Sequence, residues 1–155
     1  MNIVAHGLWG MALTPKKHFH QIKWAVFWSV FPDIFWGVAF IPWLVLQRWQ
    51  IPSDWSQAPT WFYLLYGTGH SLLVWLGVSL ILLILRKWTW PLLFWLLHIL
   101  TDIPGHTHYQ TPFLFPLSGY KVPGIFSWDN FTLNTLSHLI PLLIIISRFS
   151  LKPRK

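Results

Sequence analysis

The chain has 155 residues, of which 54% are hydrophobic, and it contains 13 Trp and 12 Phe but only 11 basic and 4 acidic residues. A soluble domain carries about 25% charged residues, so a charged fraction of 10% excludes a water-exposed globule and predicts an integral membrane protein. At roughly 20 apolar residues per span, the length allows four or five helices in one membrane-embedded domain over residues 1–155. The net charge of +7 does not indicate nucleic acid, because the basic residues cluster between apolar stretches as membrane flanks do.

Five apolar stretches follow one another in chain order. They cover residues 2–13, 24–47, 61–85, 88–101 and 131–147. These stretches are too long and too continuously apolar for the strands of a membrane barrel, which alternate over about 10 residues, so we expect helices. The predicted fold is an all-α membrane bundle of four long helices preceded by a short N-terminal helix. The Pro- and Gly-rich segment 103–130 should be an irregular outer loop that caps the bundle.

Basic residues are distributed unevenly about the expected spans. If the four long stretches cross in turn, Arg48 and Lys121 fall on one side and nine basic residues fall on the other. The nine are Lys16, Lys17, Lys23, Arg86, Lys87, Arg148, Lys152, Arg154 and Lys155. Lys and Arg concentrate in cytoplasmic loops, so the 103–130 loop should lie outside. We therefore expect an inner-membrane protein of a prokaryote whose site faces outward.

Polar side chains recur at two depths of the expected bundle. Counting residues from the cytoplasmic basic anchors at 1.5 Å per residue places one layer about 15 Å above the anchors and a second about 23 Å above them. The lower layer contains His6, Asp33, His98 and His138. The upper layer contains His70 and Asp102. Four helices that each carry a polar residue at one depth indicate a shared site.

The sequence HILTD places His98 and Asp102 four residues apart, on one face of the predicted helix. This spacing suits two ligands of one ion, or a ligand and the carboxylate that orients it. Asp33 follows Pro32, which loosens a helix, and no Lys or Arg shares its depth, although an ionised Asp in hydrocarbon needs a partner. Together these residues predict one or more divalent metal ions, with zinc as the first choice and Mn or Fe(II) as alternatives.

Histidine by itself is a weaker signal. A single His in a membrane helix more often bonds to a neighbouring helix than to a metal, and this alternative applies to His70 and His138 taken one at a time. The outer loop offers either His106 or His108 as a further ligand, and the spacing does not choose between them.

Several segments together carry a family resemblance. They are AHGLWG around His6, FPDIF around Asp33, GTGHSLL around His70, HILTDIPGHTHYQTPFLFPLS from His98 to Ser118, and His138. In order and spacing, over most of the chain, they resemble the YdjM-type family of predicted membrane-bound metal-dependent hydrolases. The run of His98, Asp102, Pro104 and a following His is more distantly similar to the ligand run of zinc-dependent phospholipase C. The resemblance implies phosphoester hydrolysis and a set of metal ligands, namely His6, Asp33, His70, His98, Asp102, His108 and His138.

The expected function is therefore metal-dependent hydrolysis of a phosphoester reached from the bilayer, lipid-linked substrates included. The metal would activate bound water and polarise the phosphoryl oxygen. Candidate general bases are Asp33 and Asp102, and candidate substrate-binding residues are Ser71, His106 and Thr111. The alternatives are a divalent-cation or proton transporter, a haem-binding electron carrier with His70 and His138 as axial ligands, and a purely structural membrane protein.

Overall fold

The computed structural model describes residues 1–50, 58–107 and 110–150, and over these ranges it contains helices and no strands. The α-helices are α1 (Ile3–Leu13), α2 (Ile22–Leu46), α3 (Thr60–Gly69), α4 (Leu72–Ile84), α5 (Leu93–Gly105) and α6 (Phe131–Ser150). Two short 3-10 helices, η1 (Lys16–Gln21) and η3 (Trp90–Leu92), precede α2 and α5. The expected all-α class and the short N-terminal helix are confirmed.

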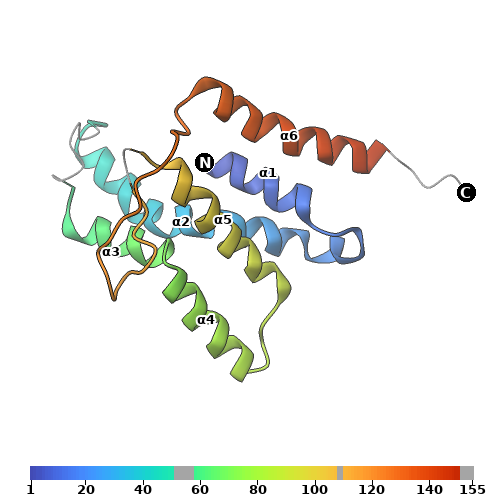
Figure 1. The fold of residues 1–155 in the computed structure, drawn as a ribbon, viewed down its shortest axis with the longest axis horizontal. Coiled ribbons are helices and arrows are strands. Elements are labelled where there is room, and N and C mark those ends of the chain that lie inside the picture. Colours follow the sequence, from blue (N-terminus) through green and yellow to red (C-terminus); the bar gives the residue numbers. More distant parts are fainter. Residues whose placement is uncertain (51–57, 108–109, 151–155) are drawn as a thin grey trace, which may run out of the picture.

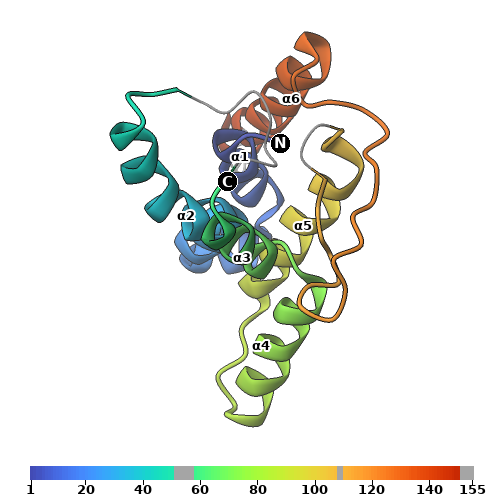
Figure 2. The ribbon, with the colours of Figure 1, turned by 90° about the vertical axis from the view of Figure 1, so that its left-hand side faces the viewer.

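The helices surround a centre formed by α1, α2 and α5 (Figure 1). Helix α6 packs along α1, and α3 packs against α2. Helix α4 points away from the centre, on the side opposite α6 (Figure 2). The polar side chains of the site described below come from α1, α2 and α5, from the junction of α3 and α4, and from His106 directly after α5, so this centre positions the site.

Within the described residues, two helices are long and apolar enough to cross a membrane. They are the stretch Lys16–Leu46, which contains η1 and α2, and Phe131–Arg148 in α6. Helices α3 and α4 add a third candidate if the bent pair is one span. The expected bundle of four long helices is thus not confirmed. Helix α5 has only 13 residues, because Pro91 lies in the turn before it and Pro104 lies in its last turn.

The prediction of one continuous helix over residues 61–85 is wrong, because the chain turns at His70 and Ser71. The axes of α3 and α4 differ by 55°. The Ser71 hydroxyl accepts hydrogen bonds from the backbone N–H groups of Leu73 and Val74 in the first turn of α4 and so caps that helix. The Gly69 carbonyl accepts a hydrogen bond from Trp95 Nε1 at 2.7 Å. Because these backbone groups are bonded, the break is tolerated in apolar surroundings.

The described part of the loop after α5 docks at two places. Near the α3–α4 break, the Leu72 N–H donates to the Phe113 carbonyl at 2.9 Å. At the end of α5, the Ile125 N–H donates to the Pro104 carbonyl at 2.7 Å, which satisfies one of the carbonyls that a helix leaves free at its C-terminus. The loop therefore covers both elements that carry His70 and Asp102.

Close packing of α1 on α2 brings His6 to the centre of the molecule. A Cβ atom at Gly10 would lie 2.6 Å from Ser29 Oγ, so only glycine permits this approach. At the other end of α1, the Arg148 guanidinium of α6 donates to the Ala12 carbonyl in the last turn of the helix and to the Thr14 carbonyl directly after it. These contacts hold α1 between α2 and α6.

Candidate metal centre

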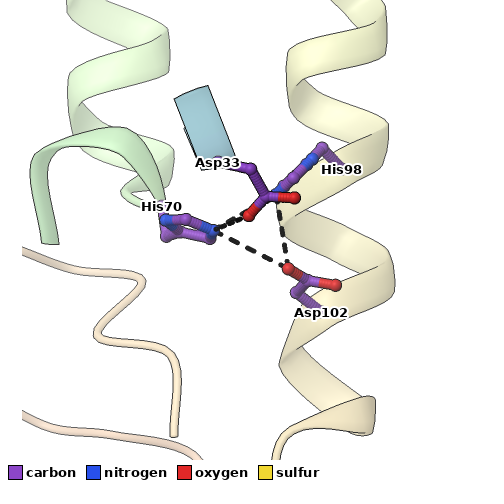
Figure 3. A group of neighbouring side chains, drawn as sticks. All are labelled: Asp33, His70, His98 and Asp102. Carbon is purple, nitrogen blue, oxygen red and sulfur yellow. Dashed lines mark hydrogen bonds and ion pairs between the residues drawn. The ribbon is translucent and has the colours of Figure 1, made fainter. Parts of the chain in front are cut away.

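Four side chains from three helical segments converge in the interior of the protein (Figure 3). Asp33 comes from α2, His70 from the break between α3 and α4, and His98 and Asp102 from successive turns of α5. One ligand atom from each residue lies within 4.8 Å of the others. The side chains of His70, His98 and Asp102 are at most 1% exposed, whereas that of Asp33 is 17% exposed. The group is thus reached from the side of Asp33.

The donor atoms have the spacing of metal ligands. His98 Nε2 lies 3.2 Å from His70 Nε2, 3.3 Å from Asp102 Oδ2 and 3.7 Å from Asp33 Oδ1. His70 Nε2 lies 3.7 Å from an oxygen of each of the two carboxylates. A tetrahedral ion with bonds of 2.0–2.2 Å separates its ligands by about 3.3–3.6 Å. The geometry therefore fits a divalent ion between two imidazoles and two carboxylates.

Hydrogen bonds at the far ring nitrogens determine what the two histidines present to the centre. His98 Nδ1 lies 2.7 Å from the Ser29 carbonyl, and His70 Nδ1 lies 3.0 Å from the Tyr66 carbonyl. A carbonyl oxygen only accepts, so each Nδ1 carries the hydrogen and each neutral ring presents a lone pair at Nε2. Two lone pairs that face each other beside two carboxylates are a set of acceptors, and a cation between them satisfies all four.

Asp102 is the central carboxylate of this group. Its Oδ2 atom is buried and has no hydrogen-bond partner among the residues that the structure describes. Its Oδ1 atom lies 3.1 Å from His6 Nε2 and forms an ion pair with the Met1 amino group. His106 Nε2 lies 3.2 Å from Oδ2. The nearby imidazole nitrogens lie within ion-pair distance of Oδ2 but form no well-aligned hydrogen bond with it. A buried oxygen without a good hydrogen bond is unfavourable, so a bound cation would stabilise Oδ2.

A cavity of about 390 Å³ opens onto the group and is lined in part by Asp33, His70, Asp102 and His106. A volume above about 300 Å³ is in the range of small-molecule sites. The His106 side chain is 26% exposed and lies at the outer part of the site. A second cavity, of about 410 Å³, lies between α1, α5 and α6 and is lined in part by His6 and His98.

The structure brings together Asp33, His70, His98 and Asp102, and places His6 against them. The His6 ring stacks on that of His98 with centroids 3.7 Å apart. The prediction of two separate layers is wrong, because Asp33 and His98 of the expected lower layer and His70 and Asp102 of the expected upper layer form one group. The depth count assumed straight parallel helices, whereas α3 and α4 meet at 55°.

His138, in contrast, does not join this group. Its Nε2 atom lies 3.0 Å from Asn2 Oδ1, and its Nδ1 atom lies 2.7 Å from the Asn134 carbonyl. The predicted ligand role for His138 therefore has no support from its position. His108 lies outside the described residues.

The candidate substrate-binding residues have different surroundings. The Ser71 hydroxyl caps α4 and donates to the Phe115 carbonyl, so it has structural partners in place of a substrate. Thr111 is buried, and its hydroxyl lies 3.5 Å from that of Tyr66. Among the candidates Ser71, His106 and Thr111, His106 lines the cavity that opens onto Asp33, His70 and Asp102.

Two residues that support the site were not predicted from the sequence. Ser29 and Tyr66 each offer a backbone carbonyl to a histidine of the group, and the Tyr66 ring stacks on His70 at 4.0 Å between centroids. Tyr66 precedes His70 by four residues, one helical turn, so the spacing gave a signal for this contact. Ser29 precedes Asp33 by the same interval, which places its carbonyl next to the site on α2.

Comparisons with protein-family models, with curated proteins and with solved structures find no match to this chain. The fold and the site by themselves define an all-helical protein, over its described residues, with helices able to cross a membrane and a buried His/Asp group that could hold a metal ion.

Proposed function

We propose that the protein is a metal-dependent hydrolase that cleaves a phosphoester reached from the membrane, with zinc as its metal. One observation carries the proposal: two imidazole lone pairs and two carboxylates face one another at 3.2–3.7 Å beside a cavity of about 390 Å³. Catalytic zinc sites use three protein ligands and leave a fourth position for water. The four donors suit this pattern if three bind the ion and the fourth acts on the water.

The unequal exposure of the two carboxylates suggests how these roles are divided. Asp102 is buried among imidazole nitrogens, which suits a ligand. Asp33 is 17% exposed and lines the cavity, which suits the general base that accepts a proton from the attacking water. His106, at the outer part of the site, would donate a hydrogen bond to a phosphate oxygen. The metal, when bound, would supply an acidified water and a positive charge next to the phosphoryl oxygen.

We further propose that the protein lies in the cytoplasmic membrane of a prokaryote, with the metal centre opening to the outside. The basic residues support this orientation, because nine of them would fall on the side opposite the loop that follows α5 if the four long apolar stretches cross in turn. The bilayer is the partner that the exposed apolar faces of α2 and α6 would contact.

The test combines metal analysis with an activity assay on protein purified in detergent. We expect stoichiometric zinc and zinc-dependent hydrolysis of bis-p-nitrophenyl phosphate, and the substitution His98→Gln should abolish both. His20→Gln is the matched control, because His20 is an exposed residue of η1 outside the group. Wild-type protein without bound metal would overturn the proposal. Metal binding without hydrolysis, together with metal uptake into proteoliposomes, would favour the transporter alternative.

A further inference from the structure

We propose that the cavity beside the metal centre holds a hydrocarbon chain, so that the substrate is a single-chain lipid phosphoester with its phosphate at the Asp33 end. This inference rests on the proposed function and adds the class of substrate. It follows from how polar and apolar side chains are distributed along the cavity, from the free space next to α2, and from the exposure of the residues at its rim.

The cavity has one polar end and apolar walls. Its polar end consists of Asp33, His70, Asp102 and His106. The lining also includes Asn2 and Met1, whose amino group forms an ion pair with Asp102. The walls of the cavity are formed by Ile3, Trp36, Phe40, Ile41, Phe62 and Tyr66. Neither Lys nor Arg lines the cavity within the described part of the chain. A charged phosphate thus finds a counter-charge only at the metal end, whereas the walls favour an apolar group.

The cavity follows α2 away from the metal group. Its lining on this helix runs from Asp33 to Ile41, and eight residues of α-helix extend about 12 Å. Gly37 lies one turn after Asp33 on the same face, and a Cβ atom built on it meets nothing within 4 Å. A glycine here leaves open space next to the carboxylate that a larger side chain would fill.

The exposure of the wall residues indicates where a chain enters. Phe40 and Phe62 are 8% and 2% exposed and form the buried part of the wall. Ile3 of α1 and Ile41 of α2 are 42% and 56% exposed, and Asn2 is an exposed polar residue beside Ile3. Ile41 would face lipid, because the stretch that contains α2 is long and apolar enough to cross a membrane. An amphiphile from the bilayer could therefore insert its chain past Ile41, and its phosphate would stop at Asp33, His70 and Asp102.

The experiment compares two glycines that both have open space around them. Gly37→Leu places a side chain in the cavity, and Gly37→Ala places a smaller one there. Gly77→Leu is the matched control, because a Cβ at Gly77 also meets nothing within 4 Å and Gly77 lies on α4, outside the cavity. Both substitutions to Leu remove a helical glycine, so their effects on helix propensity are equal.

The readouts are zinc content and the binding of butyl, octyl and dodecyl phosphonate, which are not hydrolysed, to zinc-loaded protein in lipid nanodiscs. Partition of the probes into the bilayer is the same for all variants, so differences between variants report on the cavity. Each buried methylene contributes about fourfold in affinity. We expect Gly37→Leu to bind dodecyl phosphonate about 10-fold more weakly than Gly77→Leu does, with a smaller loss for butyl phosphonate, with zinc content unchanged and with Gly37→Ala in between.

Other outcomes separate this inference from the proposed function. Equal binding of the long probe by Gly37→Leu and Gly77→Leu would overturn the inference while leaving metal-dependent hydrolysis intact. Tighter binding of a two-chain phosphatidic acid than of dodecyl phosphonate would overturn the single-chain class. Wild-type protein that binds the probes by chain length but does not hydrolyse any phosphoester would support the chain site and refute the hydrolase.

Discussion

Replacing Asp102 by Asn tests the metal centre most directly. The amide keeps the side-chain volume but removes the negative charge from an oxygen that lies 3.2–3.7 Å from three imidazole nitrogens. Loss of a partner that only orients a ligand lowers metal affinity by about 10-fold to 100-fold. Loss of the charged ligand itself should reach the upper end of this range, so we expect Asp102→Asn to bind zinc about 100-fold more weakly.

The change in affinity converts into a change in stability. With free zinc at 100 times the wild-type Kd, binding adds about 2.7 kcal/mol to the free energy of unfolding. A site that is 100-fold weaker retains about 0.4 kcal/mol under the same conditions. At about 2–4 °C per kcal/mol, zinc should raise the wild-type Tm by roughly 5–9 °C more than the Tm of Asp102→Asn.

The assay measures zinc content and Tm in detergent, with and without a chelator. Asp129→Asn is the control, because Asp129 is exposed and its carboxylate accepts a hydrogen bond from Ser127 away from the metal group. It should respond to zinc as the wild type does. If chelation leaves the wild-type Tm unchanged and Asp102→Asn retains as much metal as the wild type, the group is a structural cluster and the reasoning fails.

Three further predictions concern orientation and packing. The chain has no Cys, so a single introduced Cys reports on its own position. Leu117 is 84% exposed, and Leu117→Cys should react with an impermeant thiol reagent in intact cells, whereas Lys87→Cys should not. The reverse pattern of labelling would show that the topology is inverted. Gly10→Val should lower the free energy of unfolding by about 1–3 kcal/mol, because its Cβ would lie 2.6 Å from a side-chain oxygen of α2; an unchanged denaturation midpoint would contradict this. Ser71→Ala should lower it by about 0.5–2 kcal/mol through loss of the α4 cap, and Ser147→Ala, which removes an exposed hydroxyl, should have a smaller effect.

The amino-acid sequence alone determined the class of structure and part of the site. Its low charge and long apolar stretches predicted an all-α fold with membrane-crossing helices, because these properties depend on composition and length. The four-residue spacing of His98 and Asp102 correctly predicted that their side chains lie close together, since a helix brings such residues to one face without help from the rest of the fold. Asp33 was recognisable as a carboxylate within an apolar stretch that needed a partner.

Only the tertiary structure decided how these residues meet. The break at His70 depends on Trp95 and on loop residues more than 40 positions away, whose hydrogen bonds satisfy the interrupted backbone. No local pattern reveals such bonds, so the stretch looked like one helix and His70 was assigned to a different depth. His6 and Asp102 are 96 residues apart and touch because Gly10 lets α1 pack closely on α2. His138 has the same local signals as the ligands, but the course of α6 along α1 places it against Asn2.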